Sequence, residues 1–107
     1  MQVVCINANQ SNFTHYIGRK WAGLPESPFH NPFHIGKDGN RIDVLRKFVI
    51  YWYAPEQMAL RQLAVKTLPP EAILGCWCHP AECHGHIIAA YVKWKREQTE
   101  SPLRLFE

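Results

Sequence analysis

The 107-residue sequence lacks any apolar run that approaches the roughly 20 residues needed to cross a bilayer. Its first ten residues, MQVVCINANQ, have neither the basic segment nor the long apolar core of a signal peptide. We therefore expect a cytoplasmic protein with no membrane partner. In that reducing compartment the four cysteines are expected to be thiols, metal ligands or nucleophiles rather than disulfides.

The sequence also lacks a strong charge and any low-complexity segment. Its net charge of +3 is too small by itself to indicate a nucleic-acid-binding protein, although it permits anionic ligands. Hydrophobic residues make up 47% and charged residues 20%, which is a globular composition. The length and composition predict one domain over residues 1–107, with a core over about 2–97 and a tail over 98–107.

The apolar pattern predicts an alternation of strands and helices. Strands are expected over residues 3–6 and 72–78, with a short strand or an extended loop over 14–19. Gly75, within the strand at 72–78, marks a close approach of the backbone. Helices are expected from Asn40 as an N-cap, from Pro55, and over residues 84–97. The first helix carries five apolar residues at a spacing that predicts its inward face: Ile42, Leu45, Phe48, Val49 and Trp52.

This order of elements predicts the α/β class. We expect a single small domain with a short, mostly parallel sheet flanked by about three helices. Ligands of such sheets bind beyond the carboxyl ends of the strands. That rule directs attention to the residues that follow Cys78.

The stretch GCWCHPAECHGH, residues 75–86, gathers three of the four cysteines and three of the six histidines. One interpretation is a zinc site held by Cys76, Cys78, Cys83 and His84, since three thiolates and one imidazole are a common tetrahedral ligand set. His79 or His86 are alternatives to His84. An iron–sulfur cluster held by the three cysteines is a less favoured alternative.

A second interpretation makes Cys83 a metal-free nucleophile. Cys83 precedes the last predicted helix, where the helix dipole stabilises a thiolate and attracts anions. His84 and His86 are the candidate acid–base residues. Because adjacent residues rarely face each other, we expect His86, or His34 from elsewhere in the chain, to be the better partner. A third interpretation is structural, with buried thiols and a capping histidine.

The segment before the first predicted helix forms a candidate anion site. Residues 20–39 contain prolines, glycines and aromatics, which predicts an ordered loop that lies over a site. Lys37 and Arg41 flank a glycine-rich turn, and Arg19 adds a possible bidentate anion contact. A plain turn explains the Asp38–Gly39 pair equally well.

Four blocks of the sequence carry a resemblance to a known family: residues 16–19, 31–41, 75–78 and 83–85. Over about residues 16–92 the chain resembles the domain of unknown function 4326 family, which occurs in bacteria and their phages. If a phage encodes the protein, the expected location is the host cytoplasm. The resemblance implies a shared site built from Arg19, Asn31, Arg41, Cys76, Cys78, Cys83 and His84. His86 departs from the family pattern, in which an acidic residue is commoner.

These observations lead to two hypotheses. In the first, a nucleotide-directed hydrolase or transferase holds a phosphate-bearing ligand, a nucleotide or nucleic-acid component, with Arg19, Asn31, His34, Lys37 and Arg41. The Cys/His cluster then either binds zinc to activate water or presents a thiolate. In the second, a zinc-stabilised module without enzymatic activity binds a nucleic acid or a protein. Three protein ligands plus water favour the first hypothesis, and four protein ligands favour the second.

Overall fold

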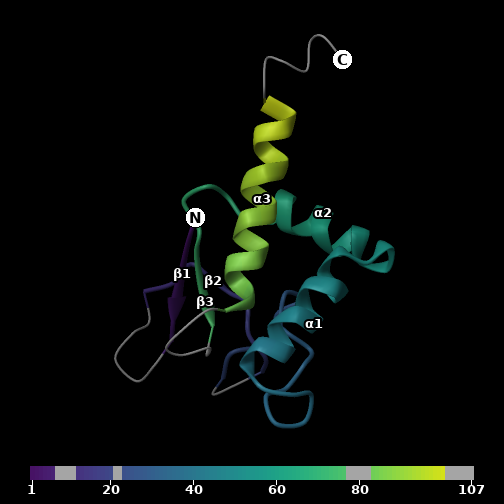
Figure 1. Cartoon of the computed structure of the whole chain (residues 1–107). Coiled ribbons are helices and arrows are strands. Elements are labelled where there is room, and N and C mark those ends of the chain that lie inside the picture. Colours follow the sequence, from purple (N-terminus) through teal and green to yellow (C-terminus); the bar gives the residue numbers. More distant parts are fainter. Residues whose placement is uncertain (7–11, 21–22, 77–82, 101–107) are drawn as a thin grey trace.

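The computed structural model of the chain describes residues 1–6, 12–20, 23–76 and 83–100. Within these ranges the chain forms three parallel strands, three α-helices and a short 3₁₀ helix (Figure 1). The predicted α/β class with a parallel sheet and about three helices is therefore confirmed. None of the helices in this described part is long and apolar enough to cross a membrane.

The sheet has the strand order β1–β3–β2, with β3 at its centre. β1 covers Gln2–Cys5, β2 covers His15–Tyr16 and β3 covers Ile73–Cys76. Leu74 of β3 pairs with Val3 on one side and His15 on the other. The short strand expected within residues 14–19 is therefore present, and the part of the predicted strand 72–78 beyond Cys76 lies outside the described residues.

Gly75 is required at the centre of this sheet. A Cβ atom at this position would lie 2.7 Å from the Phe13 ring and 2.9 Å from Ile6 Cδ1. Since real Cβ contacts are essentially never this short, any larger residue would push the neighbouring side chains apart. The close approach that the sequence predicted at Gly75 is therefore observed.

Helix α1, Arg41–Tyr53, begins at the predicted N-cap. The side chain of Asn40 accepts a hydrogen bond from Asp43 N at 2.9 Å, and the Asp43 carboxylate accepts one from Asn40 N at 3.0 Å. This reciprocal capping box satisfies two backbone donors at the start of the helix. At the other end, Arg61 donates to the carbonyls of Trp52 and Ala54 at 2.6 and 2.8 Å.

The predicted inward face of α1 is partly wrong. Phe48 and Trp52 are fully buried, but Ile42 and Val49 are 58% and 39% exposed. Val44 takes the remaining inward position, because residues 44, 48 and 52 recur every four residues on one side of the helix. The error has a physical cause: α1 carries apolar residues on both sides, so periodicity alone does not select the buried one.

The remaining helices follow the predicted breaks. Pro55 begins a 3₁₀ turn, Pro55–Gln57, which leads into α2, Met58–Thr67. Helix α3 spans His84–Glu100, slightly longer than the predicted 84–97. Trp94 is 52% exposed, and Ile88 and Val92 supply the buried positions in this part of the helix.

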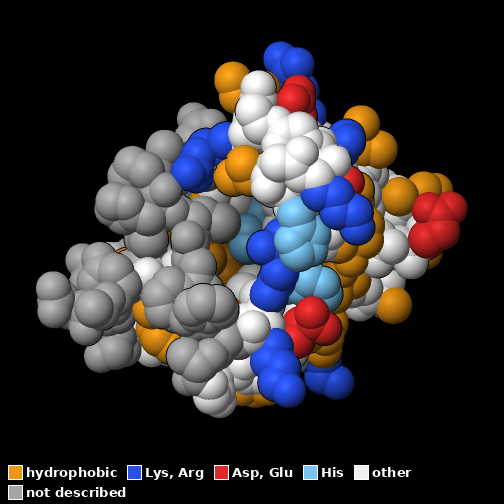
Figure 2. All heavy atoms as spheres, turned by 90° about the horizontal axis from the view of Figure 1, so that it is seen from below, with side chains coloured by type: hydrophobic (Ala, Val, Ile, Leu, Met, Phe, Trp, Pro, Cys, Tyr) orange, Lys and Arg blue, Asp and Glu red, His pale blue; other side chains and the backbone are white. Residues whose placement is uncertain are grey.

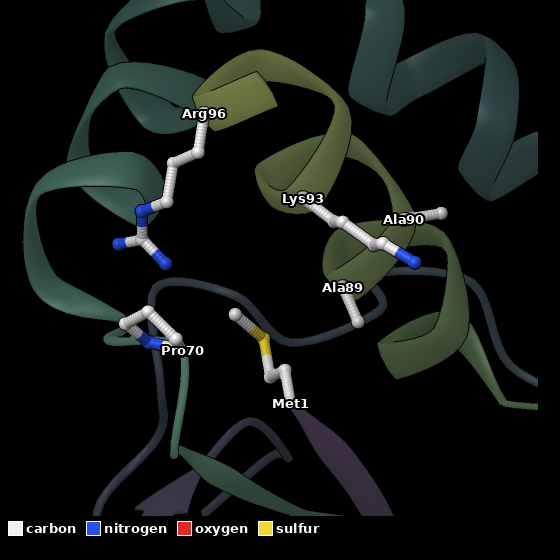
Figure 3. Close-up of a pocket in the computed structure, with 6 residues that line it drawn as sticks. All are labelled: Met1, Pro70, Ala89, Ala90, Lys93 and Arg96. Atoms are coloured by element: carbon white, nitrogen blue, oxygen red, sulfur yellow. The ribbon is translucent and has the colours of Figure 1, made fainter. Parts of the chain in front are cut away.

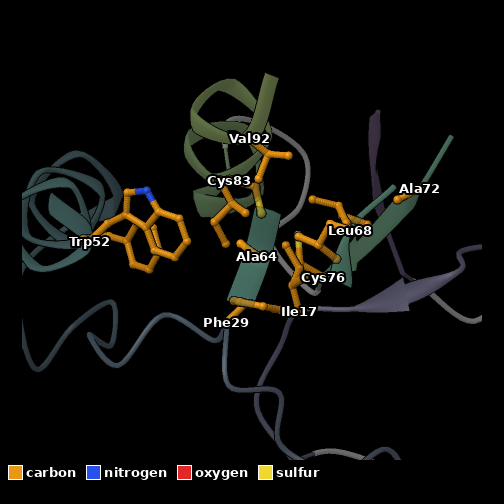
Figure 4. Packing of buried hydrophobic residues seen from close by; sticks show 12 residues of the cluster. Ile17, Phe29, Trp52, Ala64, Leu68, Ala72, Cys76, Cys83 and Val92 are labelled. Atoms are coloured by element: carbon orange, nitrogen blue, oxygen red, sulfur yellow. The ribbon is translucent and has the colours of Figure 1, made fainter. Parts of the chain in front are cut away.

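The core is one cluster at the junction of the helices and the sheet. Helix α3 lies between the sheet on one side and α1 and α2 on the other (Figure 1). Cys76 and Cys83 both belong to this cluster, together with Ile17, Leu68 and Val92 (Figure 4). The two thiols of the GCWCHPAECHGH stretch that the structure describes are therefore buried among apolar side chains.

Candidate functional site

The three parallel strands end where α1 and α3 begin, at the lower end of the molecule in Figure 1. Seen from that end, Lys, Arg and His side chains gather on one face (Figure 2). Two helix N-termini and the carboxyl ends of three strands therefore meet there, which is where ligands of parallel sheets bind. Most of the described predicted site residues belong to segments at this end.

Cys83 is placed at the start of α3 with two polar neighbours around its sulfur. Gly85 donates its backbone N–H to Cys83 Sγ at 3.3 Å, and His84 Nδ1 lies 3.6 Å from the same sulfur. The side chain is 2% exposed. A backbone donor at a helix N-terminus stabilises negative charge on sulfur, whereas the apolar surroundings of a buried thiol oppose it.

The imidazole of His84 is held from its far side. Its Nε2 lies 2.8 Å from the carbonyl oxygen of Ile17, a residue 67 positions away in the sequence. A carbonyl oxygen only accepts hydrogen bonds, so Nε2 carries a proton and Nδ1 is the ring nitrogen that faces Cys83 Sγ. The ring also makes an edge contact with Phe48, with centroids 5.1 Å apart.

Gly85 explains why a glycine follows the Cys–His pair. A Cβ atom at Gly85 would lie 2.7 Å from Ile17 Cδ1 and 2.9 Å from Val3 Cγ1. The start of α3 thus packs directly onto the sheet, and this contact brings His84 within reach of the Ile17 carbonyl. The CHG sequence is a packing requirement as well as a chemical one.

His86 does not face the sulfur, contrary to the expectation that it would be the better partner of Cys83. Its Nδ1 accepts from Cys83 N at 3.3 Å and also lies 3.3 Å from Cys83 O, and the residue is exposed. The ring therefore folds back over the first turn of the helix. His84 makes the sulfur contact because α3 starts at this residue and the Ile17 carbonyl fixes its ring.

Two of the four predicted metal ligands lie side by side. Two ligands of one tetrahedral zinc, at about 2.3 Å for sulfur and about 2.0 Å for nitrogen, are separated by about 3.5 Å, and Cys83 Sγ and His84 Nδ1 are 3.6 Å apart. Cys76 is 1% exposed in the same cluster, and Cys78 lies outside the described residues. Among the residues that the structure describes, no group of three His, Cys, Asp or Glu side chains is placed to hold a metal.

Arg19 and Asn31 converge on one residue of the predicted loop. The Arg19 guanidinium donates to the carbonyl of Phe33, and Asn31 Oδ1 accepts from the Phe33 N–H at 2.9 Å. Asn31 is 8% exposed, and Tyr16 donates its hydroxyl proton to the Arg19 carbonyl. These hydrogen bonds tie the described part of the loop to the segment that follows β2.

The turn between His34 and Arg41 is closed by its own carboxylate, that of Asp38. Asp38 Oδ2 accepts from the His34 N–H at 2.8 Å, and Lys47 Nζ donates to the Asp38 carbonyl at 2.8 Å. Gly36 and Gly39 adopt φ values of 99° and 117°, a region that favours glycine. The His34 N–H, with weaker help from the charge of Lys47, holds the pKa of Asp38 below its ordinary value.

These contacts change the expected anion site. The capping box of Asn40 and Asp43 occupies backbone donors at the start of α1, so an anion there would compete with a carboxylate already in place. The cationic side chains of the loop stay near this end: Lys37 is exposed and Arg41 is half-buried. Anion binding at this end therefore depends on side chains more than on the helix terminus.

A separate pocket of about 400 Å³ lies toward the other end of α3 (Figure 3). Apolar side chains of Met1, Pro70, Ala89 and Ala90 line it together with Lys93 and Arg96. The Arg96 guanidinium donates to the carbonyl of Val65 at 2.7 Å. None of the predicted site residues lines this pocket, so it is distinct from the Cys83–His84 site.

The fold and the site define a class: a small α/β protein with a Cys–His pair at a helix N-terminus, beside the carboxyl ends of parallel strands. The profile of the family described as Domain of unknown function (DUF4326) matches residues 5–94. The chain belongs to that family, as the four sequence blocks indicated. Comparisons with curated proteins and with solved structures gave no match.

Sequence reasoning missed the groups that orient the site. The Ile17 carbonyl fixes His84, but no side-chain pattern signals the role of a backbone oxygen. Phe48, which contacts the imidazole edge, was predicted only as a core residue. Gly85 was the sequence feature that could have indicated this arrangement, because it marks a close approach between the start of α3 and the sheet.

Proposed function

We propose that the protein binds a phosphate-bearing ligand, a nucleotide or nucleic-acid component, and that Cys83 acts on it as a nucleophile in a hydrolytic or transfer reaction. One observation carries the proposal. The sulfur of Cys83 accepts a backbone N–H from Gly85 and faces Nδ1 of an imidazole that the Ile17 carbonyl holds in place. A nucleophile, a base and a group that orients the base are the parts of an activated-cysteine site.

The pair supports proton transfer between sulfur and nitrogen. The hydrogen bond to Ile17 keeps the proton on Nε2, so Nδ1 is the atom that takes the proton of the Cys83 thiol. The resulting thiolate is stabilised by the Gly85 N–H and by the positive end of the α3 dipole. Both charges form in a buried site, where their attraction is stronger than in water.

In the proposed reaction the Cys83 thiolate forms a bond to the electrophilic centre of the ligand. The leaving group departs with the bonding electrons and takes the proton from His84 Nδ1. In hydrolysis, water then attacks the covalent intermediate and regenerates the thiol; in transfer, an acceptor hydroxyl or amine replaces the water.

The basic end of the molecule supports an anionic ligand. Arg19, Lys37 and Arg41 belong to segments that border the carboxyl ends of the strands, where Figure 2 shows the cationic side chains. Since the α1 N-terminus is already capped, we assign the phosphate to these side chains. Asn31 and His34 shape the same loop through their hydrogen bonds to Phe33 and Asp38.

The ligand part of the proposal is tested by titrating inorganic phosphate and mixed nucleotides into the protein and following backbone amide shifts by NMR. We expect the amide signals of residues 17–20 and 34–41 of the wild type to shift during the titration. We expect Arg41→Ala to bind the same ligands at least tenfold more weakly. Lys66→Ala is the control, because Lys66 is an exposed cation on α2, outside these two segments. Equal binding by the wild type and Arg41→Ala contradicts the phosphate assignment.

The chemical part is tested with the same nucleotides by following turnover, and by trapping the intermediate with acid quench and mass spectrometry. A covalent adduct on Cys83, absent in Cys83→Ser and reduced in His84→Gln, is the expected result. Cys76→Ala is the control, since Cys76 is equally buried. Turnover that persists in Cys83→Ser contradicts the nucleophile assignment.

A second candidate is a zinc-stabilised binding module without enzymatic activity, whose partner is a nucleic acid or a protein. It is favoured by the 3.6 Å separation of Cys83 Sγ and His84 Nδ1 and by the hydrogen bond from Nε2 to a backbone carbonyl. Zinc-binding histidines usually make such a bond with their second nitrogen. The proposed ligands are Cys76, Cys78, Cys83 and His84, with an iron–sulfur cluster as the less favoured occupant.

Elemental analysis of protein purified without chelators separates the two candidates. The zinc module predicts one zinc per chain, lost in Cys83→Ala, and unfolding when a chelator is added. Metal-free protein that keeps its melting temperature leaves the thiolate mechanism as the remaining proposal. An absorption band in the visible region of anaerobic protein would identify iron and sulfur instead.

A further inference from the structure

The side of α1 that faces away from the core is apolar. Opposite its three buried residues the helix exposes a stripe of four side chains, which we call the outer stripe: Ile42 at 58%, Val49 at 39%, Ile50 at 74% and Tyr53 at 51%. At about 100° per residue these positions fall within one sector of about 100°. The four side chains therefore share one side of the helix, with the exposed Arg46 among them.

A helix that is apolar on both sides is typical of a helix packed on both sides. Met58, at the corner that follows α1, is a further exposed hydrophobic side chain, at 54%. Figure 2 shows hydrophobic side chains along the side of the molecule that α1 and this corner form. Exposed apolar patches of a few hundred Å² usually mark interaction sites.

Two charges accompany the outer stripe. Arg46 is exposed and lies within the stripe, between Ile42 and Ile50 along the helix. Glu56 is exposed in the 3₁₀ turn just beyond the end of α1. In the described part of the chain neither side chain has a hydrogen-bond or ion-pair partner. Ten residues separate them, roughly 15 Å along a helix, so they do not meet within one chain.

The outer stripe with Arg46 and Glu56 is a self-complementary surface. When two copies of α1 pack antiparallel about a two-fold axis, each residue meets the one at the mirrored position of its partner. An axis near residue 51 places Arg46 of one copy opposite Glu56 of the other, and Val49 opposite Tyr53. Each favourable contact is then made twice.

We propose that the outer stripe is a homodimer interface, in which α1 packs antiparallel against α1 of a second copy. The surface is preformed, because Arg61 ties the α1–α2 corner together through the carbonyls of Trp52 and Ala54. Glu56 is thereby held at a fixed position relative to the stripe.

The proposal is tested by sedimentation velocity of the wild type and of two charge-reversal variants, Arg46→Glu and Glu56→Arg. The wild type is expected to pass from monomer to dimer between 5 and 500 µM. Each variant alone places like charges opposite each other twice, so it loses both favourable contacts and is expected to dimerise at least tenfold more weakly.

Mixing the two variants gives the sharpest result. The Arg46→Glu copy carries a carboxylate at both positions, and the Glu56→Arg copy carries a guanidinium at both, so the mixed pair restores both contacts and forms a heterodimer with wild-type affinity. Lys66→Glu, an exposed reversal on α2, is the control and keeps wild-type dimerisation. Circular dichroism checks that each variant is folded, and Ile50→Glu provides an independent disruption of the stripe.

Three outcomes overturn the proposal: a wild type that stays monomeric at 500 µM, charge variants that dimerise as the wild type does, or variants that fail to recover on mixing. The first leaves a different protein as the occupant of the stripe. The other two place any dimer interface elsewhere on the molecule.

Discussion

The N-termini of α1 and α3 lie at the same end of the molecule but are closed in different ways. At α1, a neutral amide and a carboxylate of the chain itself, Asn40 and Asp43, cap the first turn. At α3, a thiol and one imidazole take that place: the sulfur of Cys83 receives the Gly85 N–H, and His86 Nδ1 receives the Cys83 N–H. A carboxylate of the chain is already in place at the start of α1, whereas a thiol occupies the start of α3. This difference underlies the proposal that the first helix start is structural and the second carries chemistry.

The largest expected effect comes from removing the oriented imidazole at α3. His84→Ala leaves the Ile17 carbonyl without its partner and opens a cavity beside Phe48. We expect a loss of about 3 kcal/mol in the free energy of unfolding, measured by urea denaturation. His86→Ala is the matched control and is expected to lose less than about 1 kcal/mol, since its ring is exposed. Equal losses would show that the two histidines are equivalent caps.

The next effect tests how tightly the start of α3 packs on the sheet. In Gly85→Ala the added methyl lies within 3 Å of Ile17 and Val3, so we expect a loss of about 2 kcal/mol in thermal or urea unfolding. Shortening Ile17 to valine in the same chain removes one colliding atom, so the double variant is expected to lose less than the sum of the two single changes. Full additivity would argue against a direct contact.

A smaller effect is expected at the start of α1. Asn40→Ala removes one half of the capping box and is expected to cost about 1 kcal/mol of stability, without changing the reactivity of Cys83. Gln62→Ala, an exposed change within α2, serves as the neutral control. A change in thiol chemistry on loss of the Asn40 cap would contradict the separation between the two helix starts.

The smallest effect concerns the pH dependence of the stability that the turn between His34 and Arg41 contributes. The pKa of Asp38 is lowered in the folded protein, so its contribution to stability is fully present above its ordinary value of 3.8 and is lost as the pH falls through the folded pKa. The difference in unfolding free energy between the wild type and Asp38→Asn should therefore shrink as the pH falls below about 4. Denaturation at several pH values between 2.5 and 7 measures it, and parallel curves over that range would contradict the hydrogen bond to His34.

Features encoded by neighbouring residues were predictable from the sequence. The Asn40 cap, the break at Pro55 and the close approach at Gly75 each follow from one or two adjacent positions. The strand order was not predicted, because pairing of β3 with both β1 and β2 depends on contacts far apart in the chain. The inward face of α1 was partly wrong for a related reason: a helix with two apolar sides needs its neighbours to define the core.

In the candidate site, too, features set by adjacent residues were predictable and features set by distant contacts were not. Its residue types were visible in the CWC and CHG blocks, but the partner of Cys83 was not, because a distant backbone carbonyl sets the orientation of His84. The expectation that adjacent residues do not face each other fails here, since His84 is the first residue of α3 and its ring turns back beside the sulfur. Geometry of this kind arises only after α3 has docked on the sheet.

The most direct test is a titration of the native thiols by thiolate absorbance at 240 nm in chelator-treated protein, comparing the wild type with Cys83→Ala and Cys76→Ala. If Gly85 and His84 hold Cys83 as a thiolate, the wild type and Cys76→Ala show one thiolate already present at pH 7, and Cys83→Ala lacks it. If the Cys83 signal instead appears only at pH values above about 8.5, where an ordinary cysteine ionises, the sulfur is a buried core thiol and the proposed chemistry is wrong.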